Sequence, residues 1–93
     1  MILEIVSPEA TLFKGNVNSV SVPGIDGEFQ MLNNHAAIVS VLAKGNVKIN
    51  ISGNSFSQED LAAFKKVSEN VYWLPIKSGT IEMSNNKVIV LAD

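Results

Sequence analysis

The sequence predicts an all-β fold: a flattened antiparallel sandwich or barrel built from short strands. Two observations predict it. Apolar and polar residues alternate strictly in several short runs, which is the pattern of a strand with one buried face. Glycine, asparagine and proline recur between these runs at short intervals, where they favour tight turns. The 93 residues suffice for a single domain, spanning 1–93, with one thin core.

The expected strands follow from the alternating runs. Residues 46–51 are N-V-K-I-N-I, so their three apolar side chains share one face. In residues 18–22 the valines alternate with serines in the same way. Further strands are expected at 2–6, 36–42, 71–74, 80–83 and 88–91. We expect the core to contain Val20, Val22, Val47, Ile49, Ile51, Ile81 and Val90.

Turn-forming residues separate these runs. Asn and Gly adopt positive φ at low steric cost, which tight hairpins require. The expected turns lie at Pro23-Gly24 with Asp26-Gly27, at Asn33-Asn34, at Lys44-Gly45, and at Ser84-Asn85-Asn86.

Residues 57–66 interrupt the β pattern and predict a short helix. Ser57 is a suitable N-cap, acidic residues follow it, and two lysines lie near the end. Leu61 and Phe64 are spaced to face the core together. Because so short a helix is marginal by itself, it would depend on packing. The alternative is an irregular hairpin connection.

Composition and charge exclude several classes of protein. Seven basic and nine acidic residues give a net charge of −2 without a basic run, which argues against nucleic-acid binding. The absence of cysteine excludes disulfides, thiolate metal sites and a cysteine nucleophile. No apolar run approaches the roughly 18 residues that span a bilayer, so direct membrane insertion is not expected. The first residues lack the features of a signal peptide, and the protein is expected to stay where it is made.

Three ionisable residues near turns are candidates for chemistry. Asp26, Glu28 and His35 could form an acid pair with a general base, or a carboxylate–imidazole metal site. The alternative is that they serve turns and contacts, and it is favoured because the chain has a single histidine. Phosphate-binding glycine loops and a Gly-x-Ser-x-Gly motif are absent. The sequence therefore predicts no catalytic residue, no metal and no cofactor.

Tyr72 and Trp73 permit a different function. They could stack a glycan or nucleotide in a free-standing β-sandwich module. Their apolar neighbours Val71 and Leu74 instead favour core packing, for Trp73 above all. A ligand-binding module is therefore kept as the alternative to the function that follows.

Several ordered motifs in the chain resemble one family. The motifs are L-E-I-V-S-P-E at 3–9, L-F-K-G at 12–15, V-S-V-P-G-I-D-G-E-F at 20–29, N-H-A at 34–36, and the stretch 79–93. In order and spacing they resemble the N-terminal β-sandwich domain of the epsilon-subunit family of F-type ATP synthases. The resemblance covers the chain apart from residues 50–76.

The resemblance implies a flattened ten-stranded antiparallel sandwich, consistent with the alternating runs. It also implies a rotor subunit of the central stalk, which links the gamma subunit to the c-ring and helps couple proton flow to ATP synthesis. Catalysis would lie on other subunits, so the chain would be a non-catalytic part of an enzyme complex. The expected location is the bacterial inner membrane, as a peripheral protein on the cytoplasmic side.

The resemblance further implies contact residues. Asp26, Gly27, Glu28 and Phe29 correspond to a turn that lies against the polar loops of the c-ring, which carry a basic residue. Glu28 is the first candidate for a charge-assisted contact, with His35 nearby and Gly27 allowing close backbone approach. Ser7 and Ser40 match positions that face gamma in the family.

The chain departs from the family pattern at several places. Gln30 replaces a usual glycine and Asn33 a common proline. The resemblance therefore does not predict the geometry of the turn before His35. Residues 52–70 form a longer stretch than usual. The helical hairpin that follows the sandwich in many members is expected to be absent after Asp93, and with it inhibition or ATP sensing through those helices.

Overall fold

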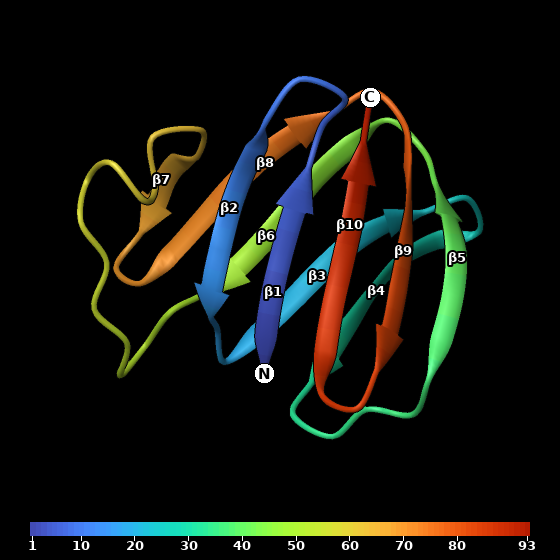
Figure 1. Cartoon of the computed structure of the whole chain (residues 1–93), viewed down its shortest axis with the longest axis horizontal. Helices are drawn as coiled ribbons and strands as arrows, with labels where there is room; N and C mark the ends of the chain where they lie inside the picture. Colours follow the sequence, from blue (N-terminus) through green and yellow to red (C-terminus); the bar gives the residue numbers. More distant parts are fainter.

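Figure 1 shows the computed structural model, which describes residues 1–93. It contains ten strands and no helix, which confirms the all-β prediction. Accordingly, no segment qualifies as a membrane-crossing helix. The strands are β1 (Ile2–Val6), β2 (Thr11–Asn16), β3 (Ser19–Gly24), β4 (Gly27–Leu32), β5 (Ile38–Leu42), β6 (Gly45–Asn50), β7 (Lys65–Ser68), β8 (Val71–Ile76), β9 (Gly79–Ser84) and β10 (Lys87–Ala92).

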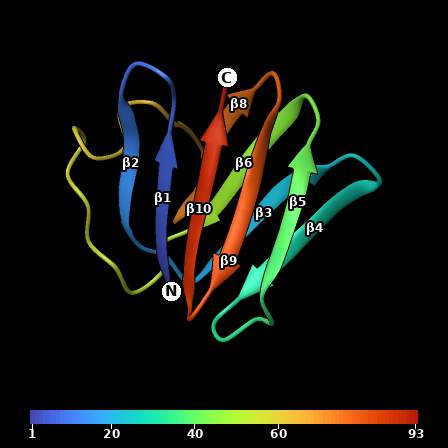
Figure 2. The same cartoon turned by 45° about the vertical axis from the view of Figure 1, so that its right-hand side comes forward.

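The strands form two layers that cross at an angle (Figures 1 and 2). The first layer has the order β2-β1-β10-β9-β5, and the second has the order β4-β3-β6-β8-β7. Neighbouring strands are antiparallel except β1 and β10, where Leu3 pairs with Val88 and Ile5 with Val90 in parallel. No hairpin joins these two strands, so no tight turn forces them to be antiparallel.

Strand pairing joins the two layers on one side only. At this corner Gly24 of β3 pairs with Leu42 of β5. A Cβ on Gly24 would lie 2.7 Å from the carbonyl oxygen of Gly27, so only glycine fits the corner without a shift. On the opposite side no pairing joins β2 to β7. The fold is therefore an open sandwich and not a closed barrel.

The core lies between the layers and is entirely apolar. Twenty residues are buried, and none of them is polar or charged. Because no buried side-chain polar atom lacks a partner, the interior stores no unsatisfied hydrogen bond. The alternation that predicted the core is confirmed, since all seven predicted residues are at most 6% exposed: Val20, Val22, Val47, Ile49, Ile51, Ile81 and Val90.

The predicted helix at residues 57–66 does not form. Its N-terminal signal is nevertheless used: the backbone N of Ser57 donates to Asp60 Oδ2 at 3.1 Å, and the backbone N of Asp60 donates to Ser57 Oγ at 3.2 Å. This reciprocal pair is the arrangement of a helix capping box. The backbone bonds that follow span three residues rather than four, as between Phe64 N and Leu61 O at 3.0 Å.

Packing explains why the helix prediction was wrong. Leu61 is buried, and the Phe64 ring meets Phe13 of β2 edge to face, with centroids 5.4 Å apart. These contacts fix both side chains within one turn of the chain, and Lys65 already begins β7. Too few residues are left for a helix to repeat its hydrogen bonds.

The remaining differences concern strand limits. Alternation alone did not predict β2, β4 or β7, and β5 begins at Ile38 rather than at residue 36. The run at 71–74 extends through Pro75 to Ile76. Pairing with β7 reaches only Trp73, so at Pro75 β8 is an edge strand, where proline is tolerated.

The asparagine turn signals are confirmed by the backbone. Asn85 and Asn86 have φ of 50° and 60° and join β9 to β10. Asn34 has φ of 62° after β4. In the β3–β4 hairpin the positive φ falls on Gly27 and not on the two residues at the tip.

Candidate interaction surfaces

The β3–β4 hairpin forms a corner of the molecule beside β5 (Figures 1 and 2). Gly24 pairs with Gly27, which leaves Ile25 and Asp26 at the exposed tip. Gly27 has φ of +126°, and a Cβ there would meet nothing within 4 Å. Glycine is therefore required at this position by the backbone conformation and not by close packing within the chain.

Glu28 lies next to the hairpin tip, where β4 begins. Its Oε1 is 2.9 Å from Nζ of Lys48 on β6. The same ammonium lies 4.3 Å from the ring centre of Trp73 on β8. Because β3 runs between β4 and β6, Lys48 reaches diagonally across it, past Ser21 and Pro23. We call these three residues the Glu28–Lys48–Trp73 row.

Phe29 points into the sandwich, opposite to Glu28, and packs against the core. With Glu28 and the hairpin tip it lines a hollow of about 690 Å³ between β4 and β5, where Val39, Ser40 and Val41 form the other side. The Oγ of Ser40 donates to the carbonyl of Val41 at 3.4 Å. The structure thus brings Ser40, expected to face gamma, beside the residues expected to face the c-ring.

His35 is not near Glu28. It follows β4 in the connection to β5, and the strand from Glu28 to Leu32 is about 13 Å long at the usual rise. Its backbone N donates to the carbonyl of Leu32 at 3.1 Å, and its Nδ1 is 2.7 Å from the carbonyl oxygen of Ala36. The expected proximity was wrong because β4 places the two residues at opposite ends.

The separation of Glu28 from His35 bears on the chemical alternatives. An acid–base or metal site built from Asp26, Glu28 and His35 needs all three side chains around one point. The structure shows no group of three His, Cys, Asp or Glu residues arranged to hold a metal ion. The three residues therefore share no site.

Tyr72 and Trp73 also point to opposite faces, as neighbours on a strand do. Tyr72 packs against the core, whereas Trp73 lies on the outer face beneath Lys48. The prediction of a core position for Trp73 was wrong, because Leu74 and Ile76 occupy the inward positions of β8. Two rings on opposite faces cannot stack on one ligand, which removes the observation behind the ligand-binding alternative.

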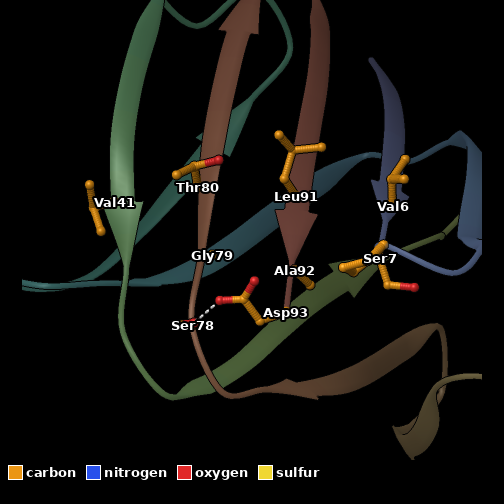
Figure 3. A pocket seen from close by; sticks show the side chains of 10 residues that line it. Val6, Ser7, Val41, Ser78, Gly79, Thr80, Leu91, Ala92 and Asp93 are labelled. Atoms are coloured by element: carbon orange, nitrogen blue, oxygen red, sulfur yellow. Dashed lines mark hydrogen bonds between the residues drawn. The ribbon is translucent and has the colours of Figure 1, made fainter.

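An open groove lies where β1 and β10 end and β9 begins (Figure 3). Its volume is about 560 Å³. Ser7 lies at its edge, and its Oγ accepts a hydrogen bond of 3.2 Å from the backbone N of Ala10. Asp93 lies at the rim and accepts a hydrogen bond from the Ser78 hydroxyl.

Apolar side chains continue from this groove across the outer face of the first layer. Val41 and Leu91 line the groove and are 54% and 53% exposed, and Thr80 lies between them on β9. Val39 is 77% exposed on the same face of β5. We call Val39, Val41 and Leu91 the exposed strip. Large apolar side chains exposed on the same face of a sheet are typical of an interaction surface.

The comparison with known families agrees with this architecture. Residues 1–64 match the model of the family described as the ATP synthase delta/epsilon chain, beta-sandwich domain. The chain belongs to this family. Among curated members of the delta/epsilon family, it is 35% identical to the ATP synthase epsilon chain of Chlorobaculum tepidum over 91 residues, which cover 98% of this chain and 86% of that one. It is 36% identical to the ATP synthase epsilon chain of Chlorobium limicola, with the same coverage.

Solved structures share the fold at lower sequence identity. The chain is similar to one in the central stalk and c-ring of the Tetrahymena thermophila mitochondrial ATP synthase, with a TM-score of 0.71 and 16% identity, covering 99% of this chain and 62% of that one. A chain of the Euglena gracilis mitochondrial ATP synthase gives a TM-score of 0.76 and 17% identity, covering 99% and 49%. These likenesses confirm the delta/epsilon sandwich fold.

Two sets of surface residues were not found from the sequence. Lys48 was placed on the outer face by alternation, but its contacts with Glu28 and Trp73 depend on the pairing of three other strands. The exposed strip was hidden because Val39 and Val41 fall in an apolar run that does not distinguish inside from outside.

Proposed function

We propose that this chain is the epsilon-type rotor subunit of a proton-translocating F-type ATP synthase. In this role it links gamma to the c-ring, turns with the central stalk and helps couple proton flow to ATP synthesis. It holds no catalytic residue, since catalysis lies on other subunits. The observation that carries the proposal is family membership, since the alignments with two epsilon chains cover 98% of this chain at 35% and 36% identity.

The geometry supports a linking role, because the two layers offer different surfaces. The outer face of the first layer presents the exposed strip, with Ser7 at the edge of its groove. We assign this side to gamma. An apolar strip beside hydroxyl groups suits a stable contact between two proteins that do not slip.

The hairpin corner presents the other surface. Asp26 and Glu28 are exposed there, and Gly27 shapes the turn. We assign this corner to the basic polar loops of the c-ring. Phe29 supports the corner from inside, and Ser40 lies where the two surfaces meet. His35 would contribute to the c-ring contact only from a separate place at the far end of β4.

The names of the relatives support a proposal for the location. Relatives named ATP synthase epsilon chain imply a membrane-associated complex. We propose that this chain is peripheral, on the cytoplasmic side of a bacterial inner membrane. We propose that residues 1–93 act as one stiff domain.

The test is association with a rotor. Tagged protein is mixed with purified gamma and c-ring and recovered, and all three are expected to elute together at micromolar concentration. Failure to retain either partner would reject the proposal. Thermal melting of the tagged chain, measured in parallel, excludes misfolding as the cause.

A further inference from the structure

We propose that Lys48, held over the Trp73 ring, is a positioning residue that fixes the Glu28 carboxylate so that one of its oxygens is presented to a basic group of the partner. The inference rests on the proposed function, in which Glu28 meets a basic c-ring loop. The proposal adds a role for Lys48 and Trp73, which direct that contact.

The ion pair leaves Glu28 with capacity for a second donor. Lys48 Nζ lies 2.9 Å from Oε1, and the Glu28 side chain is 50% exposed. An ionised carboxylate has two acceptor oxygens with about four lone-pair sites. Oε2 is therefore able to accept from an ammonium or guanidinium group while Lys48 keeps Oε1.

Lys48 is well suited to hold the carboxylate in one place. It belongs to β6, which pairs with β3 on one side and β8 on the other. Its side chain is only 30% exposed, and its ammonium lies 4.3 Å from the Trp73 ring centre. The flat ring limits the positions of a flexible lysine, because the cation is attracted to the face of the indole.

Two opposite effects of Lys48 must be compared. Its charge reduces the long-range attraction of Glu28 for a cationic partner, whereas its contact lowers the entropy that Glu28 loses on binding. A partner cation on Oε2 would lie within the screening length of about 8 Å from Lys48, so the two cations still repel each other. Ordering a flexible side chain at an interface changes affinity by about 2- to 10-fold. We expect this gain to exceed the repulsion, because the carboxylate between the two cations attracts both.

The test compares affinities of full-length variants for the purified gamma–c-ring rotor at physiological salt. Lys48→Met should weaken binding by about 2- to 10-fold. Lys48→Arg should bind like the native protein, because arginine also pairs with a carboxylate over an aromatic ring. Lys66→Met is the matched control, since Lys66 pairs with Glu69 at 3.8 Å on the exposed edge strand β7. It removes the same charge away from Glu28 and should leave affinity unchanged.

A double-mutant cycle separates positioning from charge alone. Glu28→Gln should lower affinity less in the Lys48→Met background than in the native background, because the fixed carboxylate is already lost. Unchanged or tighter binding of Lys48→Met, with its melting temperature preserved, would overturn the inference while the native protein still binds the rotor.

The free protein gives an independent measurement that needs no rotor. The Lys48 methylene protons should be shifted upfield by the Trp73 ring, and this shift should vanish in Trp73→Leu. Side-chain couplings of Glu28 should indicate one dominant rotamer, which becomes averaged in Lys48→Met. Equal averaging in both proteins would contradict positioning even if the rotor never bound.

Discussion

The environment of the Glu28 carboxylate is built by residues from three strands. It lies on β4, its ion-pair partner Lys48 lies on β6, and the ring beneath that partner, Trp73, lies on β8. An exposed ion pair of this kind contributes at most about 1 kcal/mol to the free energy of unfolding. We therefore expect it to matter for binding a partner rather than for folding.

Glu28→Lys should therefore reduce coupling without unfolding the chain. The new lysine would face Lys48 and would repel a basic loop of the c-ring. Proton-driven ATP synthesis in reconstituted vesicles should fall, while the melting temperature of the isolated chain changes little. Normal synthesis at equal occupancy of the subunit would remove Glu28 from the contact.

The conformation of the segment between β6 and β7 depends on the aromatic residues that it packs against β2. Phe56 and Phe64 both meet Phe13 of β2, with ring centroids 5.3 Å and 5.4 Å away. Gly15 makes room for Phe56, because a Cβ there would overlap its ring. Residues 52–64 thus cover the side of the sandwich where β2 and β7 do not pair.

Phe56→Ala tests this covering role. Loss of one aromatic pair and its buried area should cost about 1–2 kcal/mol. For a domain of this size that cost lowers the melting temperature by roughly 4–16 °C. Ser55→Ala, one residue earlier and exposed, should have little effect. An unchanged melting temperature of Phe56→Ala would show that the segment does not seal the open side.

At the scale of the whole molecule, the two layers hold their outer surfaces apart. The only strand pairing between them is that of Gly24 with Leu42, and an apolar core fills the space between them. A close-packed core transmits displacement with little compliance, which suits a part that conveys torque. Val39 and Val41 also line the hollow beside the hairpin corner, so only substitutions away from this hollow should affect one partner and not the other.

Leu91→Asp tests the assignment of this face, because Leu91 lines the groove but not the hollow beside the hairpin. A carboxylate in the exposed strip should weaken gamma binding by about 10-fold or more, because it would be buried without a partner. Stability should change little, since Leu91 is 53% exposed. Val67→Asp is the matched control, because Val67 is 45% exposed on β7, away from the strip. Equal loss of affinity in both variants would contradict the assignment of this face to gamma.

The sequence by itself determined the fold class, four of the turns, the seven core positions and the family. A period of two residues and an ordered set of motifs are local features that need no tertiary structure. Only the tertiary structure decided that residues 57–66 stay non-helical, that His35 lies far from Glu28, and that Trp73 faces outward. Each of these depends on which strands pair and where a segment packs, and such contacts join residues far apart in the chain.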